Sequence, residues 1–174
     1  MIPLNMPVLE TPRLILRPFT EDDAPALHEV NRLPEVMRFI APVEQSVDDT
    51  LAYLKQGPLA DYAKYGYGRH ALIDKASGTL IGFCGLKYLP DLDDVDIGYR
   101  MLPEYWGQGL ATEASEVLMD YARNTLGLTR VIALALPDNH GSIAVMKKLG
   151  LVYEGTVEYL NDICALYAWN ASDD

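Results

Sequence analysis

Alternating apolar and polar side chains mark most of the extended segments of this chain. Residues 9–16 alternate through Thr11-Pro12-Arg13-Leu14-Ile15-Leu16, which predicts one continuous strand that Arg17-Pro18 ends. Arg130–Leu136 is a continuous apolar run, as expected of a strand that is covered on both faces. The other predicted strands are Gly68–Ile73, Thr79–Leu89, Val95–Leu102, Val152–Leu160 and Ile163–Asn170.

Helices are predicted where apolar residues recur every three or four positions behind a capping residue. Thr20-Glu21-Asp22-Asp23 places a hydroxyl and early carboxylates at a helix start, and Ser46-Val47-Asp48-Asp49 repeats that signal. The predicted helices are Ala24–Asn31, Thr50–Gln56, Leu59–Tyr65, Leu110–Thr125 and one that ends at Leu149-Gly150. Strands and helices are interspersed, so the fold class is α+β, with α and β elements mixed along the chain.

The chain has 174 residues, with 49% hydrophobic and 22% charged positions, and it shows no repeat or linker. We therefore expect one globular domain over residues 1–174 that folds without disulfides or a structural metal. Cys84 and Cys164 lie in apolar runs outside any CxxC motif, which favours buried free thiols.

The formal net charge of −11 argues against sequence-independent binding to nucleic acid, which needs clustered Lys and Arg. Solubility explains this acidity better than attraction of a cationic amine, although it is compatible with both. No apolar run is long enough to cross a bilayer, and the first six residues carry no export signal. We expect a cytoplasmic protein with no membrane association. The three histidines lack partners at metal-ligand spacing, so no metal site is expected.

The segment Trp106-Gly107-Gln108-Gly109-Leu110-Ala111-Thr112 places two glycines at the entry to the predicted helix Leu110–Thr125. Glycine allows close approach of the backbone to a ligand, and the N–H groups at a helix start attract anions. This arrangement suits a pyrophosphate, although an ordinary tight turn would use the same residues.

The residues around this loop resemble a known family. Asp96-Ile97-Gly98-Tyr99, followed by Tyr105-Trp106-Gly107-Gln108-Gly109-Leu110-Ala111-Thr112-Glu113-Ala114, is similar to the donor-binding motif of the GNAT acetyltransferases. Asn139, Ser142 and Lys148-Leu149-Gly150-Leu151 resemble the second half of that signature. The segment from Leu9 to Arg17 is similar to the first strand of the ribosomal-protein (RimJ/RimL-like) branch.

This resemblance implies a three-layer α/β/α fold with about four helices and a mixed, mostly antiparallel sheet of about seven strands. The fourth and fifth strands of such a sheet splay apart, and coenzyme A enters the cleft between them. In this chain those two strands would be Val95–Leu102 and Arg130–Leu136.

The resemblance also assigns residues to acetyl-CoA, the expected cosubstrate. The backbone of Met101 and Leu102 would bond the pantetheine, and Asn139 would contact the cofactor near the second strand. Extra positive charge could come from Arg100, Lys147 or Lys148, although solvated surface positions are the favoured interpretation. The pyrophosphate would be held by the N–H groups of residues 106–111, which are Trp106, Gly107, Gln108, Gly109, Leu110 and Ala111. Thr112 and Ser142 are further residues expected to bind the cofactor.

Direct attack of an amine on the thioester requires a base for the amine and a proton for the departing thiolate. Asp96 and Glu158 are the two candidate bases by position. Many relatives protonate the thiolate with a tyrosine where this chain has Met146, so Ser142 is the substitute that the motif suggests. A helix-capping role for Ser142 is equally compatible with its position. Tyr153, Tyr159 and Tyr167 remain further candidates.

Together these features predict transfer of an acetyl group from acetyl-CoA to a primary amine by a monomer or homodimer. The amine could belong to a protein amino terminus, a polyamine or an aminoglycoside. A small polycation would favour an acidic pocket built from Asp91, Asp93, Asp94 and Asp96. The alternative is a non-catalytic acyl-CoA sensor or partner subunit, because Met146 cannot donate a proton.

Overall fold

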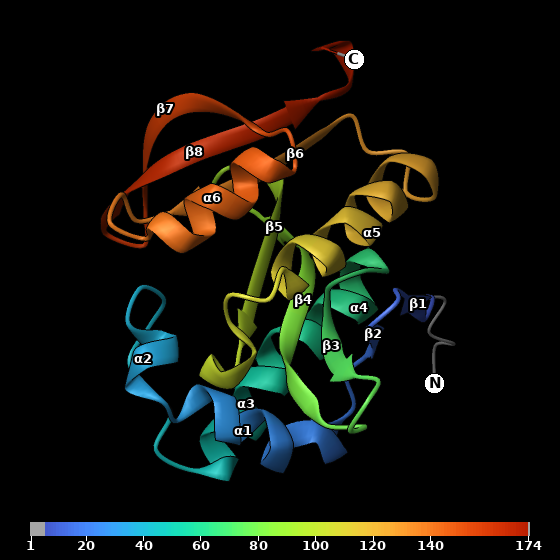
Figure 1. Cartoon of the computed structure of the whole chain (residues 1–174). Helices are drawn as coiled ribbons and strands as arrows, with labels where there is room; N and C mark the ends of the chain where they lie inside the picture. Colours follow the sequence, from blue (N-terminus) through green and yellow to red (C-terminus); the bar gives the residue numbers. More distant parts are fainter. Residues whose placement is uncertain (1–5, 174) are drawn as a thin grey trace.

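The computed structural model describes residues 6–173, and its centre is one twisted sheet (Figure 1). Eight strands follow the order β1-β2-β3-β4-β5-β6-β8-β7. Their bounds are β1 Leu9–Glu10, β2 Leu14–Pro18, β3 Arg69–Asp74, β4 Leu80–Leu89, β5 Asp94–Met101, β6 Arg130–Ala135, β7 Val152–Tyr159 and β8 Asp162–Asn170. The expected α+β class and mostly antiparallel sheet are confirmed.

The centre of the sheet contains its one parallel pair, β5 with β6. All other neighbouring strands in the described part of the chain are antiparallel. The register between β5 and β6 has a single pair, Asp96 with Ile132, whereas β4 and β5 are paired from Gly82–Met101 to Leu89–Asp94. The two parallel strands therefore separate beyond Asp96. This is the splay expected from the sequence between the fourth and fifth strands. It falls between β5 and β6 because the expected first strand is divided into β1 and β2.

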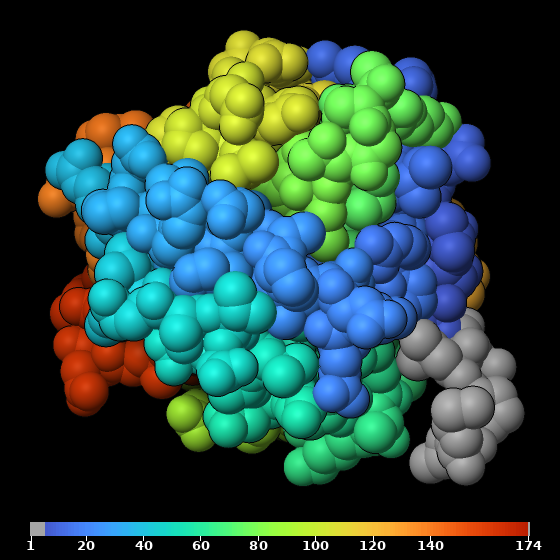
Figure 2. Space-filling view, turned by 90° about the horizontal axis from the view of Figure 1, so that it is seen from below, coloured from blue at the N-terminus to red at the C-terminus, as the bar shows by residue number. Residues whose placement is uncertain are grey.

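Helices cover both faces of the sheet and make the three layers. Leu118 and Ala122 of α5 pack with Val95 and Ile97 of β5 on one face. Leu27 and Leu54 pack with Phe83 on the other. Figure 2 shows this second face from outside, with the residues of α1 to α4, blue to teal, across its centre. The α-helices are α1 Ala24–Asn31, α2 Pro34–Met37, α3 Val47–Gln56, α4 Pro58–Tyr65, α5 Leu110–Asn124 and α6 His140–Lys148.

The structure differs from the predicted elements at two places. The expected strand over residues 9–16 is wrong, because the chain turns at residues 11–13 and β1 folds back antiparallel onto β2. The Thr11 amide donates to Leu14 O at 2.9 Å and closes this turn. The helix α2 lies where the sequence predicts irregular chain, and it brings the number of α-helices in the described residues to six, against the expected four or so. A four-residue helix is too short to leave a periodic signal.

Other local signals act as predicted. Ser46 accepts a hydrogen bond from the Asp49 amide at 3.1 Å, and the Asp49 carboxylate accepts from the Ser46 amide. This reciprocal pair satisfies two backbone donors at the start of α3, which is the purpose of a capping box. Both cysteines are buried and free. Burial raises the pKa of the Cys84 thiol to about 11, so the thiol stays protonated.

Candidate functional site

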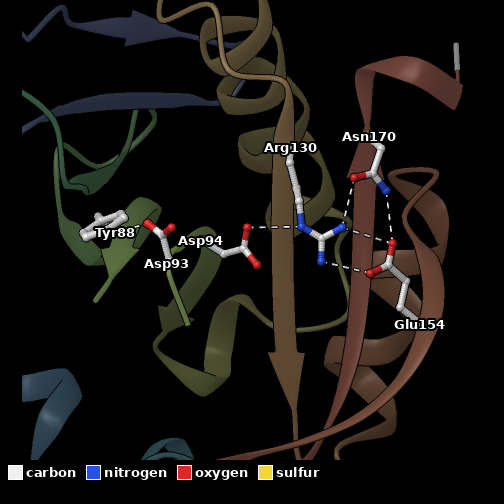
Figure 3. A network of polar contacts seen from close by, with 6 residues as sticks. All are labelled: Tyr88, Asp93, Asp94, Arg130, Glu154 and Asn170. Carbon is white, nitrogen blue, oxygen red and sulfur yellow. Dashed lines mark hydrogen bonds and ion pairs between the residues drawn. The ribbon is translucent and has the colours of Figure 1, made fainter. Parts of the chain in front are cut away.

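The closed end of the splay is held by a network around Arg130, at the start of β6 (Figure 3). Its guanidinium reaches Asp94 of β5 at 3.1 Å and forms two bonds to Glu154 of β7, at 2.9 and 3.1 Å. Asn170 of β8 accepts from Arg130 at 2.9 Å and donates to Glu154 at 3.0 Å. One side chain therefore ties four strands together at the point from which β5 and β6 diverge.

A cavity of about 560 Å³ lies beside the carboxyl end of β5, where the two strands have separated. Four segments line it: the end of β5, the loop before α5 with the first turn of that helix, one side of α6, and the α2 region. Its lining residues are Glu35, Val36, Arg38, Phe39, Ile40, Tyr99, Arg100, Met101, Tyr105, Trp106, Gly107, Gly109, Leu110, Ala111, Thr112, Asn139, Gly141, Ser142, Ala144, Val145 and Lys148. A pocket of this size and shape accommodates a small-molecule ligand.

The loop before α5 has the backbone shape that its glycines predict. Gly107 and Gly109 adopt φ values of +72° and +77°, a left-handed conformation that other residues rarely tolerate. A Cβ on Gly107 would meet no atom within 4 Å, so conformation rather than crowding requires glycine there. Gly109 is the N-cap of α5, and the residues of the first turn, with their unpaired N–H groups, lie at the cavity wall.

The β1–β2 turn fixes this loop from outside. Arg13 donates to the carbonyl oxygen of Gln108 at 2.9 Å and to the Glu113 carboxylate at 2.9 Å. Thr11 donates to the same carboxylate. Burial alone would raise the Glu113 pKa, but the bonds from Thr11 and Arg13 outweigh it and hold that pKa below its ordinary value. Gln108 lies outside the cavity lining, and its side chain donates to Glu104 O at 3.0 Å.

The end of β5 presents one of its two expected backbone groups to the splay. The Leu102 amide donates to Ile81 O at 2.9 Å, so it is directed toward β4 and away from the opening. Because consecutive amides of a strand point to opposite edges, the Met101 N–H is directed toward β6. The Met101 carbonyl accepts from the Trp106 indole at 2.8 Å, which holds the loop against the strand.

The amino end of α6 forms the opposite wall. Asn139 caps this helix, and its side-chain oxygen accepts from the Ser142 amide at 3.3 Å. The Ser142 hydroxyl lies 3.4 Å from the hydroxyl of Tyr99, which reaches it from β5. Burial raises the pKa of Tyr99 above its ordinary value, and the bond with Ser142 opposes that shift only in part. The Tyr99 phenol is therefore neutral at physiological pH.

The two candidate bases lie on opposite faces of the sheet. Asp96 alternates with Val95 and Ile97, which pack against α5, so its side chain points to the α1–α4 face. Glu158 pairs with Ile163 in the β7–β8 hairpin, which places it on the α5–α6 face, where it is exposed. Neither residue lines the cavity.

Asp96 is buried, with 7% of its surface exposed, and it accepts from the Arg69 guanidinium at 2.7 Å. Burial alone would lower the pKa of Arg69, but the charge and hydrogen bond of Asp96 raise it above its ordinary value. The guanidinium also lies over the Phe83 ring, 5.6 Å from its centroid. Asp96 is thus half of a buried ion pair.

The interpretation of Arg100 as a solvated surface residue is wrong. Only 6% of Arg100 is exposed, and its guanidinium lies over the ring of Phe83, 4.7 Å from the centroid. It donates to the side chain of Asn31 at 2.7 Å, while its buried Nε has no hydrogen-bond partner among residues 6–173. Burial lowers the pKa of Arg100 below its ordinary value. Alternation along β5 points Arg100 into the α1–α4 layer, where aromatic rings replace water.

Three of the four acidic residues expected to form an acidic pocket are engaged by other side chains, and the fourth, Asp91, is exposed. Asp93 accepts from the Tyr88 hydroxyl at 2.6 Å, Asp94 is bonded to Arg130, and Asp96 to Arg69. Glu35 is the carboxylate that lines the cavity, and the cations in that lining are Arg38, Arg100 and Lys148.

The sequence-based interpretation missed Tyr99, although the quoted motif contains it. Alternation along β5 places Tyr99 and Met101 on one face of the sheet and Asp96 and Arg100 on the other. This signal identifies the cavity face only when it is known which helices cover each face. Glu35, Arg38 and Phe39 carried no signal, because α2 shows no periodicity. Met146 lies on the buried side of α6, packs in the core and is absent from the cavity lining.

Comparison with known proteins places these features in a wider context. The sequence pattern of the acetyltransferase (GNAT) domain matches residues 13–152. The uncharacterized N-acetyltransferase YoaA of Bacillus subtilis (strain 168) is 31% identical over 153 residues, which cover 87% of this chain and 86% of that protein. Spermidine N(1)-acetyltransferase of Escherichia coli (strain K12) is 27% identical over 146 residues, covering 80% of this chain and 73% of the enzyme.

A solved structure has the same fold. The ribosomal-protein-S5-alanine acetyltransferase from Vibrio fischeri superimposes with a TM-score of 0.77 at 21% identity, over 97% of this chain and 98% of that one. Across residues 6–173, no helix is both long and apolar enough to cross a membrane.

Proposed function

Because the chain belongs to the GNAT acetyltransferase family, whose members use acetyl-CoA, we propose that the cavity beside β5 binds acetyl-CoA and brings its thioester to an amine. The chain is an N-acetyltransferase that transfers acetyl to an amine. The observation that carries the donor site is the pair of left-handed glycines at the start of α5, on the wall of a cavity that opens where β5 and β6 separate.

In this proposal the pyrophosphate is bound through backbone groups of residues 106–112. Several N–H dipoles and the amino end of α5 supply positive potential, so no lysine is needed in the loop. Met101 directs its N–H to the opening for the pantetheine, and Asn139 faces the cofactor from α6. Lys148 adds a cation to the same wall. The single globular domain and a cytoplasmic location belong to this proposal.

The reaction is direct attack of the amine on the thioester carbonyl, without a covalent acyl-enzyme. An alkyl amine is mostly protonated at neutral pH, so a carboxylate must take its proton directly or through water. Asp96 and Glu158 are the candidates. They are distinguished by position, because Asp96 lies on the α1–α4 face with Arg100 and Glu158 lies on the opposite face at the β7–β8 hairpin.

The acceptor is proposed at the level of a primary amine. A protein amino terminus, a polyamine and an aminoglycoside remain the classes to compare, and the E. coli relative acts on spermidine by its name. The expected acidic pocket near β5 gives little support to a polycation, since Asp93, Asp94 and Asp96 are already paired.

The test is release of free thiol from acetyl-CoA in the presence of spermidine, an aminoglycoside, or peptides that begin with alanine or serine. We expect turnover with one class, and binding of acetyl-CoA by calorimetry in every case. Tight binding without turnover across the panel would instead support the sensor alternative. For the base, Asp96→Asn and Glu158→Gln are compared by pH–rate profile. The variant that keeps the full wild-type profile is not the base.

A further inference from the structure

The family position that would supply a proton to the departing thiolate is unsuitable here in two ways. Met146 has no acidic proton, and its side chain is buried in the core with 6% of its surface exposed. A thiolate that leaves without a proton slows the collapse of the tetrahedral intermediate. The cavity wall offers other proton donors, because two hydroxyls in contact with each other lie there.

Tyr99 and Ser142 meet across the splay. Tyr99 extends from β5 and Ser142 from the first turn of α6, and both line the cavity. Ser142 Oγ donates to Tyr99 Oη at 3.4 Å, so the phenolic hydrogen of Tyr99 is not used in that bond. Within residues 6–173 the Tyr99 hydroxyl is an acceptor in this bond, and no hydrogen bond that it donates is found.

In the proposed function, Tyr99 lies on β5 beside the pantetheine that carries the thioester. Tyr99 precedes Met101 by two residues on the strand, and Met101 is the residue whose N–H the proposed function gives to the pantetheine. Residues two apart on a strand point to the same face, so Tyr99 and Met101 flank the same part of the opening. Burial keeps the phenol protonated, as a general acid must be before the reaction.

We propose that Tyr99 is a catalytic residue that protonates the sulfur of the leaving coenzyme A, and that Ser142 returns the proton to Tyr99. This inference rests on the proposed function. The amine nitrogen forms a bond to the thioester carbon, and the C–S bond breaks with its electron pair passing to sulfur. The Tyr99 phenolic proton moves to that sulfur. The phenolate is then reprotonated from water at the cavity mouth through Ser142, whose hydroxyl passes its hydrogen to Tyr99 as it accepts one from water in the same step. The proton of the amine leaves separately to the base. The base releases the amine proton to solvent, which restores the water.

The experiment compares Tyr99→Phe, Ser142→Ala and the double variant with wild type, using acetyl-CoA and the panel amine that wild type turns over fastest. We expect Tyr99→Phe to lower kcat about 100-fold while KM for acetyl-CoA stays within about twofold, because the lost interaction is made only in the transition state. Ser142→Ala should lower kcat less. The double variant should be no slower than Tyr99→Phe, since the two hydroxyls act in one path.

Tyr121→Phe is the matched control, since it removes a phenol that packs on the core side of α5 and lies outside the cavity lining. We expect its kcat and thermal midpoint to stay near those of wild type. A raised KM for acetyl-CoA with unchanged kcat in Tyr99→Phe would overturn the proposal, because the pair would then only hold α6 against β5. Loss of kcat in Tyr105→Phe but not in Tyr99→Phe would also overturn it. A wild type that binds acetyl-CoA and turns over no amine would defeat the proposed function itself.

Discussion

The two faces of the sheet treat buried polar groups in opposite ways. The face under α1–α4 holds ionised side chains, Arg69 paired with Asp96 and Arg100 over Phe83. The face under α5 and α6 holds neutral ones, since burial lowers the pKa of His70 to about 4 and raises that of Cys84 to about 11. On the α5–α6 face, the proposed function has the phosphates of the ligand meet backbone dipoles. On the α1–α4 face, the buried charges belong to side chains of the protein.

Removing one partner of the buried ion pair should give the largest effect. Arg69→Met leaves Asp96 buried without a cation, and we expect the free energy of unfolding to fall by about 3–5 kcal/mol. Urea denaturation measures this loss. Replacing both partners, with Asp96→Leu added, should recover part of it because no isolated charge remains. A single variant within about 1 kcal/mol of wild type would show that Asp96 is hydrated or paired elsewhere.

On the α5–α6 face, low pH should destabilise the folded protein through His70. The folded protein holds this imidazole neutral down to a pKa of about 4, whereas the unfolded chain binds a proton near pH 6.5. Unfolding therefore takes up a proton between these values, so stability falls as pH decreases from 6.5 to 4, by about 3 kcal/mol at most.

His70→Gln should remove that part of the pH dependence while carboxylate titration remains in both proteins. Unfolding curves at pH 7, 5.5 and 4.5 for the two proteins test this, and the informative quantity is the difference in their slopes. Parallel slopes would mean that the folded protein accepts a proton on His70 as readily as the unfolded chain does.

The donor loop, residues 106–109, should respond to substitution by a loss of affinity for acetyl-CoA more than by a loss of folding stability. Gly109→Trp places a bulky side chain at an exposed left-handed position on the cavity wall. We expect acetyl-CoA binding to weaken by about 30-fold or more, because the backbone could no longer approach the phosphates. Calorimetry measures this.

Gly78→Trp is the control for Gly109→Trp, since Gly78 also has a left-handed φ, of +73°, but lies in the β3–β4 turn. The Gly78→Trp variant should lose about as much unfolding free energy as Gly109→Trp and keep the wild-type affinity for acetyl-CoA. Equal affinity for both variants and wild type would remove the loop from the donor site.

The smallest effect is expected at the closed end of the splay. Arg130→Met keeps the aliphatic stem but loses the bonds to Asp94 and Glu154, and we expect a loss of about 1 kcal/mol in unfolding free energy. Arg32→Met, which breaks an exposed pair with Glu29 within one helix, should cost less than about 0.5 kcal/mol. A larger loss for Arg32→Met would contradict the role given to the network.

The sequence predicts the loop before α5 better than the polar groups of the α1–α4 face, for a physical reason. Glycine positions and helix starts are local signals, so residues 106–112 can be recognised without knowing the fold. The Arg69–Asp96 pair joins two strands that are not neighbours in the sheet, and the burial of Arg100 depends on helices that arrive from residues 24–56. Such contacts appear only after the layers are assembled. The contact of Tyr99 with Ser142 has the same origin.

The clamp of Arg13 on the donor loop bears on how acetyl-CoA is captured. The carbonyl of Gln108 and the Glu113 carboxylate are held by the β1–β2 turn, about 100 positions away in sequence. A loop that is already ordered loses little conformational entropy when its ligand arrives, so more of the contact energy remains as affinity. In the proposed function, acetyl-CoA therefore meets a loop that already has its bound shape.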